Sequence, residues 1–245
     1  MHDGKRRHFI KLAGAGVAAA VWPSFVACRR SGGVSTGAER ESLSSGAAID
    51  LQVASSDALQ SAKALPIPWM EPADWDAIAF NRTRGNRGAI PESYRDSING
   101  PDGEVAHLGK HLPYIPEIDS AQIPSGMLPL MWGDPSKGHV KHPNASPTDD
   151  NPEGHYYNWI RLRKATADEA IELETRFGTW PNNPATSSGR YRAFGGVDRT
   201  TNSGKETVYV VQIPPDILPG DTIRVWGHCI THGQYVDFIR QAEAG

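Results

Sequence analysis

The chain has 245 residues and a formal net charge of −3 at pH 7. It is long enough for one substantial domain and has no basic excess of the kind that nucleic-acid binding requires. Its 25 glycines and 19 prolines favour a loop-rich β protein over a helical bundle. The two cysteines are Cys28 and Cys229. A disulfide between them is possible in an exported protein, but the sequence around each suggests a separate use.

The N-terminus has the features of a targeting segment. Residues 5–11, KRRHFIK, are similar to a twin-arginine export signal, with a basic signal peptide of the general secretory route as the alternative. The apolar run of residues 12–27 is too short and too weakly apolar for a good membrane-spanning helix. It ends in Phe-Val-Ala before Cys28, which resembles a lipobox. We therefore expect residues 1–28 to be a signal, and lipidation of Cys28 to anchor the protein in the periplasm or at the cell surface.

Residues 29–68 are expected to form a flexible tether. The part up to about Asp50 is rich in serine, glycine, alanine and glutamate and lacks apolar periodicity. The stretch 65–68, Leu-Pro-Ile-Pro, suggests an extended lead-in to a folded domain over residues 69–245. Within that domain, residues 71–80 are expected to form a short helix.

The remainder of the domain reads as a β protein. Residues 81–103 and 120–138 are rich in turn-forming residues and are expected to be loops. Short patterns typical of strands cover residues 156–163, 170–177, 190–194, 207–213, 222–228 and 235–239. Turn signals such as Pro214-Pro215-Asp216 separate them, which predicts an antiparallel sandwich.

The last turn contains a candidate metal-binding motif. Cys229 follows a predicted strand, and His232 comes at the C-x-x-H spacing that lets a thiolate and an imidazole on one tight turn meet the same metal. Gly233 permits a sharp turn after them. Haem attachment would need C-x-x-C-H, and no second cysteine is nearby. Alone, this motif is weak evidence, so further ligands are needed.

Three further motifs precede it in the chain: Lys110-His111-Leu112-Pro113, His142-Pro143-Asn144, and His155 at the start of a strand. Together with Cys229-Ile230-Thr231-His232-Gly233, they resemble the iron-binding domain of superoxide reductases, the neelaredoxin and desulfoferrodoxin family. The resemblance extends over about residues 104–240. The sequence lacks the cysteines of the rubredoxin-like module, so it is similar to the one-iron type.

The resemblance implies an immunoglobulin-like β-sandwich whose loops hold one iron ion, Fe²⁺ or Fe³⁺. The implied ligands are four histidines and one axial thiolate: His111, His142, His155, His232 and Cys229. The implied reaction is the one-electron reduction of superoxide to hydrogen peroxide, with an external electron-donor protein restoring Fe²⁺. Lys110 would steer the anion and stabilise developing negative charge.

Some positions depart from the family pattern. Gly109 replaces the glutamate that can occupy the sixth position of oxidised iron, and Ile230 replaces an asparagine. The loop between His142 and His155 is longer than usual. The other histidines, His107, His139 and His228, are expected not to be ligands, and His228 should point away from the site because it is adjacent to Cys229 on a strand.

Other readings of the same residues stay open. The chain could be a non-catalytic exported metal-binding or electron-transfer module on the same fold, which the missing glutamate supports. It could be a structural sandwich with incidental histidines, although their clustering in family order argues against this. A zinc site is a variant, but structural zinc prefers four ligands rather than five.

Overall fold

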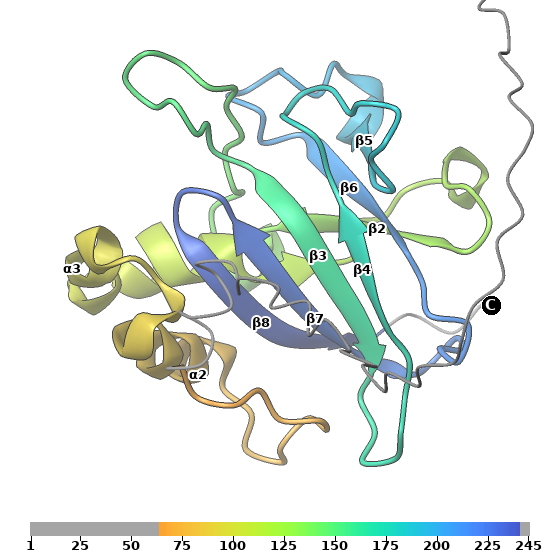
Figure 1. Cartoon of the computed structure of the whole chain (residues 1–245), viewed down its shortest axis with the longest axis horizontal. Helices are drawn as coiled ribbons and strands as arrows, with labels where there is room; N and C mark the ends of the chain where they lie inside the picture. The colour runs from red at the N-terminus through yellow and green to blue at the C-terminus, as the bar shows by residue number, and fades with distance from the viewer. Residues whose placement is uncertain (1–63, 241–245) are drawn as a thin grey trace, which may run out of the picture. The chain divides into compact units, whose positions relative to one another are not determined.

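A computed structural model describes residues 64–240, which form two antiparallel sheets of four strands each (Figure 1). The first sheet has the order β1 (Pro113–Tyr114), β2 (Met127–Trp132), β6 (Thr207–Gln212) and β5 (Arg190–Ala193). The second has the order β4 (Glu172–Arg176), β3 (Tyr157–Lys164), β7 (Thr222–Cys229) and β8 (Gly233–Arg240). The predicted mostly-β, antiparallel architecture is therefore confirmed. The signal, Cys28 and residues 29–63 of the tether lie outside the described residues.

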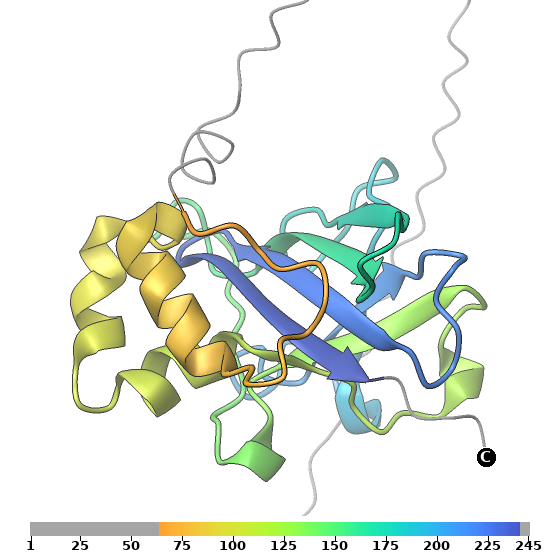
Figure 2. The same cartoon turned by 90° about the horizontal axis from the view of Figure 1, so that it is seen from below.

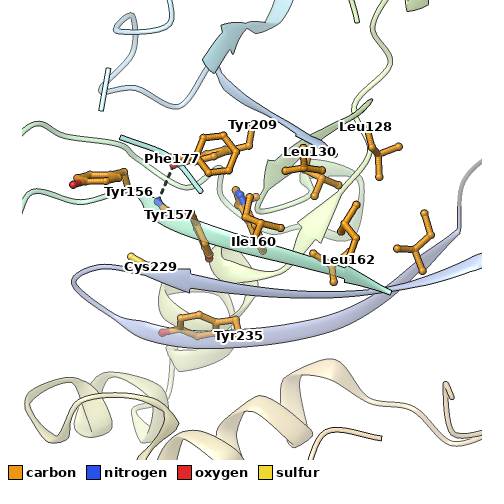
Figure 3. Close-up of a cluster of buried hydrophobic side chains, with 14 of the residues drawn as sticks. Leu128, Leu130, Tyr156, Tyr157, Ile160, Leu162, Phe177, Tyr209, Cys229 and Tyr235 are labelled. Carbon is orange, nitrogen blue, oxygen red and sulfur yellow. Dashed lines mark hydrogen bonds between the residues drawn. The ribbon is translucent and has the colours of Figure 1, made fainter. Parts of the chain in front are cut away.

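The hydrophobic core lies between the sheets (Figure 3). Leu128 and Leu130 of β2 face Ile160 and Leu162 of β3, and Tyr209 of β6 extends the same layer; all five are buried. Successive residues of a strand point to opposite faces, so this alternation places one row of side chains inside. Full burial of each such aliphatic side chain contributes about 1.5–3 kcal/mol.

All six predicted strands are present, with ends shifted by at most a few residues. The expected loop at 120–138 is wrong, because Met127–Trp132 forms β2. Pro129 lies within this strand. It is tolerated because β1 pairs only with Met131 and Trp132, which leaves β2 without a partner on that side at Pro129.

The helical part of the domain is larger than predicted. Helix α2 covers Ala77–Arg84, so it begins later and continues further than the expected helix at 71–80. The expected loop at 81–103 is also wrong. After α2 the chain forms successive short helical segments: a π-helix at Gly85–Ala89, a 3-10 helix at Glu92–Tyr94, α3 at Arg95–Asn99, a π-helix at Glu104–Leu108 and a 3-10 helix at Gly109–His111. Their buried apolar residues, Ile90, Ile98 and Leu108, are too widely spaced to give a helical period in the sequence.

Helix α2 covers the edge of the second sheet. The side-chain amide of Asn81 donates to the carbonyl oxygen of Val236 in β8 (2.7 Å), and the Val236 amide donates back to Asn81 Oδ1 (2.9 Å). This pairing satisfies backbone groups that an edge strand would otherwise expose. Figures 1 and 2 show the helices beside β8, next to the turn that contains His232.

Residues 65–68, assigned above to the tether, contact the domain. The carbonyl oxygen of Leu65 accepts a hydrogen bond from Arg84 Nε, and that of Pro68 accepts one from Arg224 Nη1, both at 3.2 Å. The folded part therefore includes these residues. Within residues 64–240, we find no helix with the length and apolar character needed to cross a membrane.

Candidate metal centre

The structure gathers all five residues that the resemblance implied as ligands. These are His111, His142, His155, Cys229 and His232. One potential ligand atom from each lies within 4.8 Å of all the others. His111, His142 and Cys229 are buried, and the other two are partly buried. This cluster of four histidines and one cysteine could hold a metal ion.

The four imidazoles form a closed ring. The ring centroid of His142 lies 4.9 Å from that of His111 and 4.3 Å from that of His155. His232 completes the ring, at 4.5 Å from His155 and 4.9 Å from His111. Across the ring, the centroids of His111 and His155 are 6.3 Å apart. Four imidazoles so arranged can approach a single ion from four sides.

The β7–β8 turn supplies two of the five residues. Cys229 ends β7, and His232 Nδ1 lies 3.6 Å from Cys229 Sγ and 3.2 Å from His111 Nε2. These distances identify Nδ1 as the His232 atom that faces the cluster. Gly233 has a φ of 86° and packs where a Cβ would lie 2.4 Å from the Ala89 carbonyl oxygen, so this tight turn requires glycine.

The asparagine of the His-Pro-Asn motif, Asn144, fixes the position of the segment by hydrogen bonds. The backbone amide of Asn144 donates to the Ser203 carbonyl oxygen (3.0 Å), and its side-chain amide donates to that of Gly204 (2.8 Å). Tyr209 donates its hydroxyl to Asn144 Oδ1 from the core side. These bonds hold the segment that carries His142 against the 203–204 turn.

The long loop after this motif is closed at its base. Ala145 and His155 exchange two backbone hydrogen bonds, of 2.8 and 2.9 Å. The Thr231 hydroxyl donates to the Gly154 carbonyl oxygen (2.5 Å), which ties the loop to the β7–β8 turn. The extra residues therefore project away from the base without separating His142 from His155.

Several ring nitrogens in the cluster have no hydrogen-bond partner within residues 64–240. His142 Nδ1 and Nε2 and His155 Nε2 are buried without a hydrogen bond. Buried polar atoms without partners are rare in proteins and call for an explanation, and a metal ion would supply one. The unpartnered atoms belong to the residues that converge on one point, which fits a bound cation.

Burial keeps these imidazoles neutral. It lowers the pKa of His111 and of His142 well below 6.5, and the neighbouring histidines lower it further. Burial also lowers the pKa of His155 to about 3 and that of His232 to about 2. Metal binding requires the neutral imidazole, so no proton has to be removed from these rings at neutral pH.

The Cys229 thiol is fully buried, which raises its pKa to about 12. Hydrogen bonds from the backbone amides of His232 and Thr231, and the charge of Lys110, act in the opposite direction. A thiolate at this position therefore needs a cation as its partner. A metal ion supplies that charge, because a coordinating thiol binds in its deprotonated form.

His107 has a role that the sequence reasoning missed. It is buried in the helical turn before His111, and its carbonyl oxygen lies 2.6 Å from His111 Nδ1, which donates to it. That bond leaves His111 Nε2 free to face the cluster. The His107 ring contacts the Tyr235 hydroxyl through Nε2 (2.8 Å). The i, i+4 spacing to His111 is the signal that could have indicated this supporting position.

His139 and His228, the other histidines of the part of the chain that the structure describes, lie outside the cluster, as expected. His228 is on the outer face of the sheet, where its ring stacks on Trp159 (5.5 Å, 16°) and its Nδ1 lies 2.7 Å from Asn158 Oδ1. His139 packs against Gly109. A Cβ on Gly109 would lie 2.5 Å from His139 Cδ2 and 2.6 Å from the Glu104 carbonyl oxygen. The position where the family has glutamate therefore has no room for a side chain.

Lys110 lines a cavity that reaches the cluster from solvent. This cavity has a volume of about 360 Å³, and Tyr94, His107 and His232 also contribute to its wall. Burial lowers the pKa of Lys110, and the charge of Cys229 raises it. None of the ion pairs formed within residues 64–240 includes Lys110. Its ammonium group is therefore available to a ligand that enters the cavity.

Comparison of the chain with protein-family models, with curated proteins and with solved structures finds no match.

Proposed function

We propose that the protein is a superoxide reductase of the one-iron type, which reduces superoxide to hydrogen peroxide at a non-haem Fe(His)₄(Cys) centre. The observation that carries the proposal is the ring of four imidazoles with the buried Cys229 thiol beside it. Five such ligands leave one position of a six-coordinate ion open. Imidazole suits iron, and a thiolate ligand pushes electron density onto it.

The residues around the centre suit an anionic substrate. Bound iron would supply the electron by changing between Fe²⁺ and Fe³⁺, and each superoxide takes up one electron and two protons to become hydrogen peroxide. The neutral histidines would not reduce the positive charge of the metal, and the Cys229 thiolate would reduce it by one. The positive charge that remains would favour an anion. Lys110 adds a protonated amine on the cavity wall, where it would attract superoxide and donate a hydrogen bond to it. An external electron-donor protein would restore Fe²⁺.

We also propose that the sandwich is immunoglobulin-like. When the strands are lettered in chain order with β4 as C′, the first sheet has the order A-B-E-D and the second the order C′-C-F-G. Immunoglobulin domains have this arrangement of sheets. This strand order supports an immunoglobulin-like fold. In such a fold the five candidate ligands come from loops and strand ends at one end of the sandwich.

The proposals about export rest on the sequence of residues 1–28, which lie outside the described residues. We propose export by the twin-arginine route, lipidation of Cys28, and a periplasmic or cell-surface location. Replacing Arg6 and Arg7 with lysine should block processing of the precursor. The mass of the mature N-terminus should show a lipid-modified Cys28, and unmodified cleavage at another residue would contradict lipidation.

Metal reconstitution tests the main proposal. The protein is loaded anaerobically with Fe²⁺ and its iron content is measured. One portion is oxidised for its absorption spectrum, and a second, still reduced portion is exposed to no more than one superoxide per iron, because each Fe²⁺ supplies one electron. We expect a thiolate-to-Fe³⁺ charge-transfer band, and one hydrogen peroxide per superoxide without dioxygen. Cys229→Ser should keep the fold and lose the band and most of the activity, whereas Cys28→Ser should keep both. A Cys229→Ser variant with the parent spectrum and rate would show that Cys229 is not a ligand.

The absence of room for a carboxylate at Gly109 favours a second candidate, a non-catalytic metal-binding or electron-transfer module. The same experiment separates the two functions. A module of this kind would bind iron and show the charge-transfer band, but it would not consume superoxide. The zinc alternative predicts neither the band nor any reduction.

A further inference from the structure

A second polar site lies on the outer face of the second sheet, away from the core. Here a cavity of about 580 Å³, which we call the arginine pocket, is lined by Arg84 of α2, Arg163 of β3 and Arg224 of β7. The three arginines are only 2%, 5% and 4% exposed, respectively. Trp69 and Trp226 also line the pocket. Within residues 64–240, none of the five metal-cluster residues lines it.

Only part of the buried positive charge of the arginine pocket is balanced by an ion pair between described residues. Within residues 64–240, the acceptors for Arg163 are backbone carbonyl oxygens, among them those of Thr166 (3.2 Å) and Asp168 (3.0 Å). Arg84 donates to the Leu65 carbonyl oxygen and to the side chain of Gln234. Among the described residues, only Arg224 has an ion-pair partner, which is Glu172.

Three hydrogen-bond donors of the pocket residues have no partner among the described residues. Arg84 Nη1, Arg224 Nε and Trp226 Nε1 are buried and make no hydrogen bond. Two of them belong to guanidinium groups that are more than nine-tenths buried. A buried donor without an acceptor costs free energy, and a buried cation without an anion costs more. An oxyanion that reached these donors from the pocket, with small shifts of their side chains, would reduce both deficits.

The aromatic rings hold the guanidinium groups in place. The guanidinium carbons of Arg163 and Arg224 lie 4.3 and 5.0 Å from the Trp69 ring centroid, and that of Arg84 lies 5.5 Å from the Trp226 centroid. Such contacts restrict the side chains before any ligand arrives. The rest of the wall is largely apolar and includes Leu65, Pro66, Ile67, Ala167 and Ala170.

We infer that the arginine pocket binds an organic monocarboxylate with a compact apolar body, whose carboxylate accepts hydrogen bonds from Arg84, Arg224 and Trp226. A carboxylate has about four lone-pair sites for these three donors. A dianion fits less well, because Glu172 lines the pocket and the exposed Asp168 and Glu169 add negative charge to its wall. This inference goes beyond the proposed function and does not depend on the metal.

Benzoate is a suitable probe, because it combines a carboxylate with a flat apolar ring, and benzamide is its neutral counterpart. We expect benzoate to bind the full-length protein at one site by calorimetry. It should also shift the indole N–H resonance of Trp226 in a ¹⁵N-labelled sample. Benzamide should bind at least about tenfold more weakly, since one hydrogen bond to a charged group contributes about that factor. Inorganic phosphate should also bind more weakly than benzoate, because Asp168, Glu169 and Glu172 oppose its second charge and it lacks an apolar body.

The variant Trp226→Phe keeps an aromatic ring but removes the indole N–H together with part of the ring, so it should fold and bind benzoate at least about tenfold more weakly. Trp159→Phe is the matched control, because Trp159 contacts Trp226 edge-on (5.2 Å) without lining the pocket. It should bind like the parent. The inference is overturned if benzoate causes no shift, if benzamide or phosphate binds as tightly, or if Trp226→Phe keeps the parent affinity.

Discussion

Tyr235 lies flat against the imidazole of His111, with ring centroids 4.2 Å apart and planes inclined by 6°. Its hydroxyl donates to the His232 carbonyl oxygen (2.9 Å) and lies 2.8 Å from His107 Nε2, which must donate to it. Tyr235 therefore fixes two residues of the metal cluster at once, through the ring of His111 and the backbone of His232. Because it belongs to β8, the sheet itself positions this half of the cluster.

Tyr235→Phe should weaken metal binding by about tenfold, because outer-shell partners of ligating histidines typically contribute 10–100-fold to affinity. The phenyl ring keeps the stacking on His111, but the bond to the His232 carbonyl oxygen is lost and His107 Nε2 is left without its acceptor. The measurement is metal affinity by competition with a chelator of known strength.

Tyr191→Phe is the matched control for this experiment. Tyr191 is also buried, and its hydroxyl donates to the Gly178 carbonyl oxygen at 2.8 Å, but it belongs to β5 of the other sheet. It should lose stability by about 1 kcal/mol and keep the parent metal affinity. Equal affinities of both variants would show that Tyr235 has no special part in the centre.

The candidate ligands could be predicted because they stand in short motifs that resemble those of a known family, and two of these motifs include a residue that the fold itself requires. Asn144 anchors the segment of His142, and Gly233 makes the turn of His232 possible. The supporting residues could not be predicted in the same way. Tyr235 reads as an ordinary strand residue, and its role appears only when β8 packs beside the helical turn of His107.

The strands could be predicted from their alternation, which burial on one face of a sheet produces directly. The helical segments before the site could not. Asn81 looks like a loop residue in the sequence, yet it is buried because it pairs with the edge of β8. Pro129 looks like a strand breaker, yet β2 tolerates it on its free side. In both cases a tertiary partner outweighs the local pattern.

Lys110→Ala should slow the reaction with superoxide and leave iron bound. The ammonium group lines the cavity beside His232 without belonging to the cluster, so its removal takes away attraction for the anion without removing a ligand. Screening shortens to about 8 Å at physiological salt, so the parent rate should fall as salt rises, and the variant rate should fall less. The measurement is the second-order rate over a salt series.

Lys137→Ala is the control for this series, because Lys137 is exposed on a turn and does not line the cavity. The Lys137→Ala variant should react with superoxide at the parent rate and with the parent dependence on salt. If Lys110→Ala also matches the parent in both respects, Lys110 is only a surface lysine.

Gly109→Ala should destabilise the fold by about 1–3 kcal/mol, the usual cost of adding a methyl group to a filled site. The new Cβ would meet the ring of His139 and the fixed carbonyl oxygen of Glu104. His139→Ala in the same chain should restore only part of the stability, since the carbonyl contact remains. Gly100→Ala, whose closest contact would be 3.3 Å, is the control. Equal urea midpoints for Gly109→Ala and the parent would contradict the observed packing.

Asp237 should make stability depend on pH. It is buried in β8 and accepts hydrogen bonds from Trp75 Nε1 and from the Phe238 amide, both 2.8 Å. Burial raises its pKa above the ordinary value of 3.8, an effect that these bonds only partly offset. The folded state then holds this proton to a higher pH than the unfolded state does. The contribution of Asp237 to the free energy of unfolding should therefore fall as pH rises from 3.8 through the raised pKa.

Asp237→Asn keeps an acceptor and does not titrate. Urea unfolding across this pH range should therefore show a smaller loss of stability for Asp237→Asn than for the parent. The exposed Asp102→Asn should follow the parent, and an unchanged slope in Asp237→Asn would rule out this residue as the source.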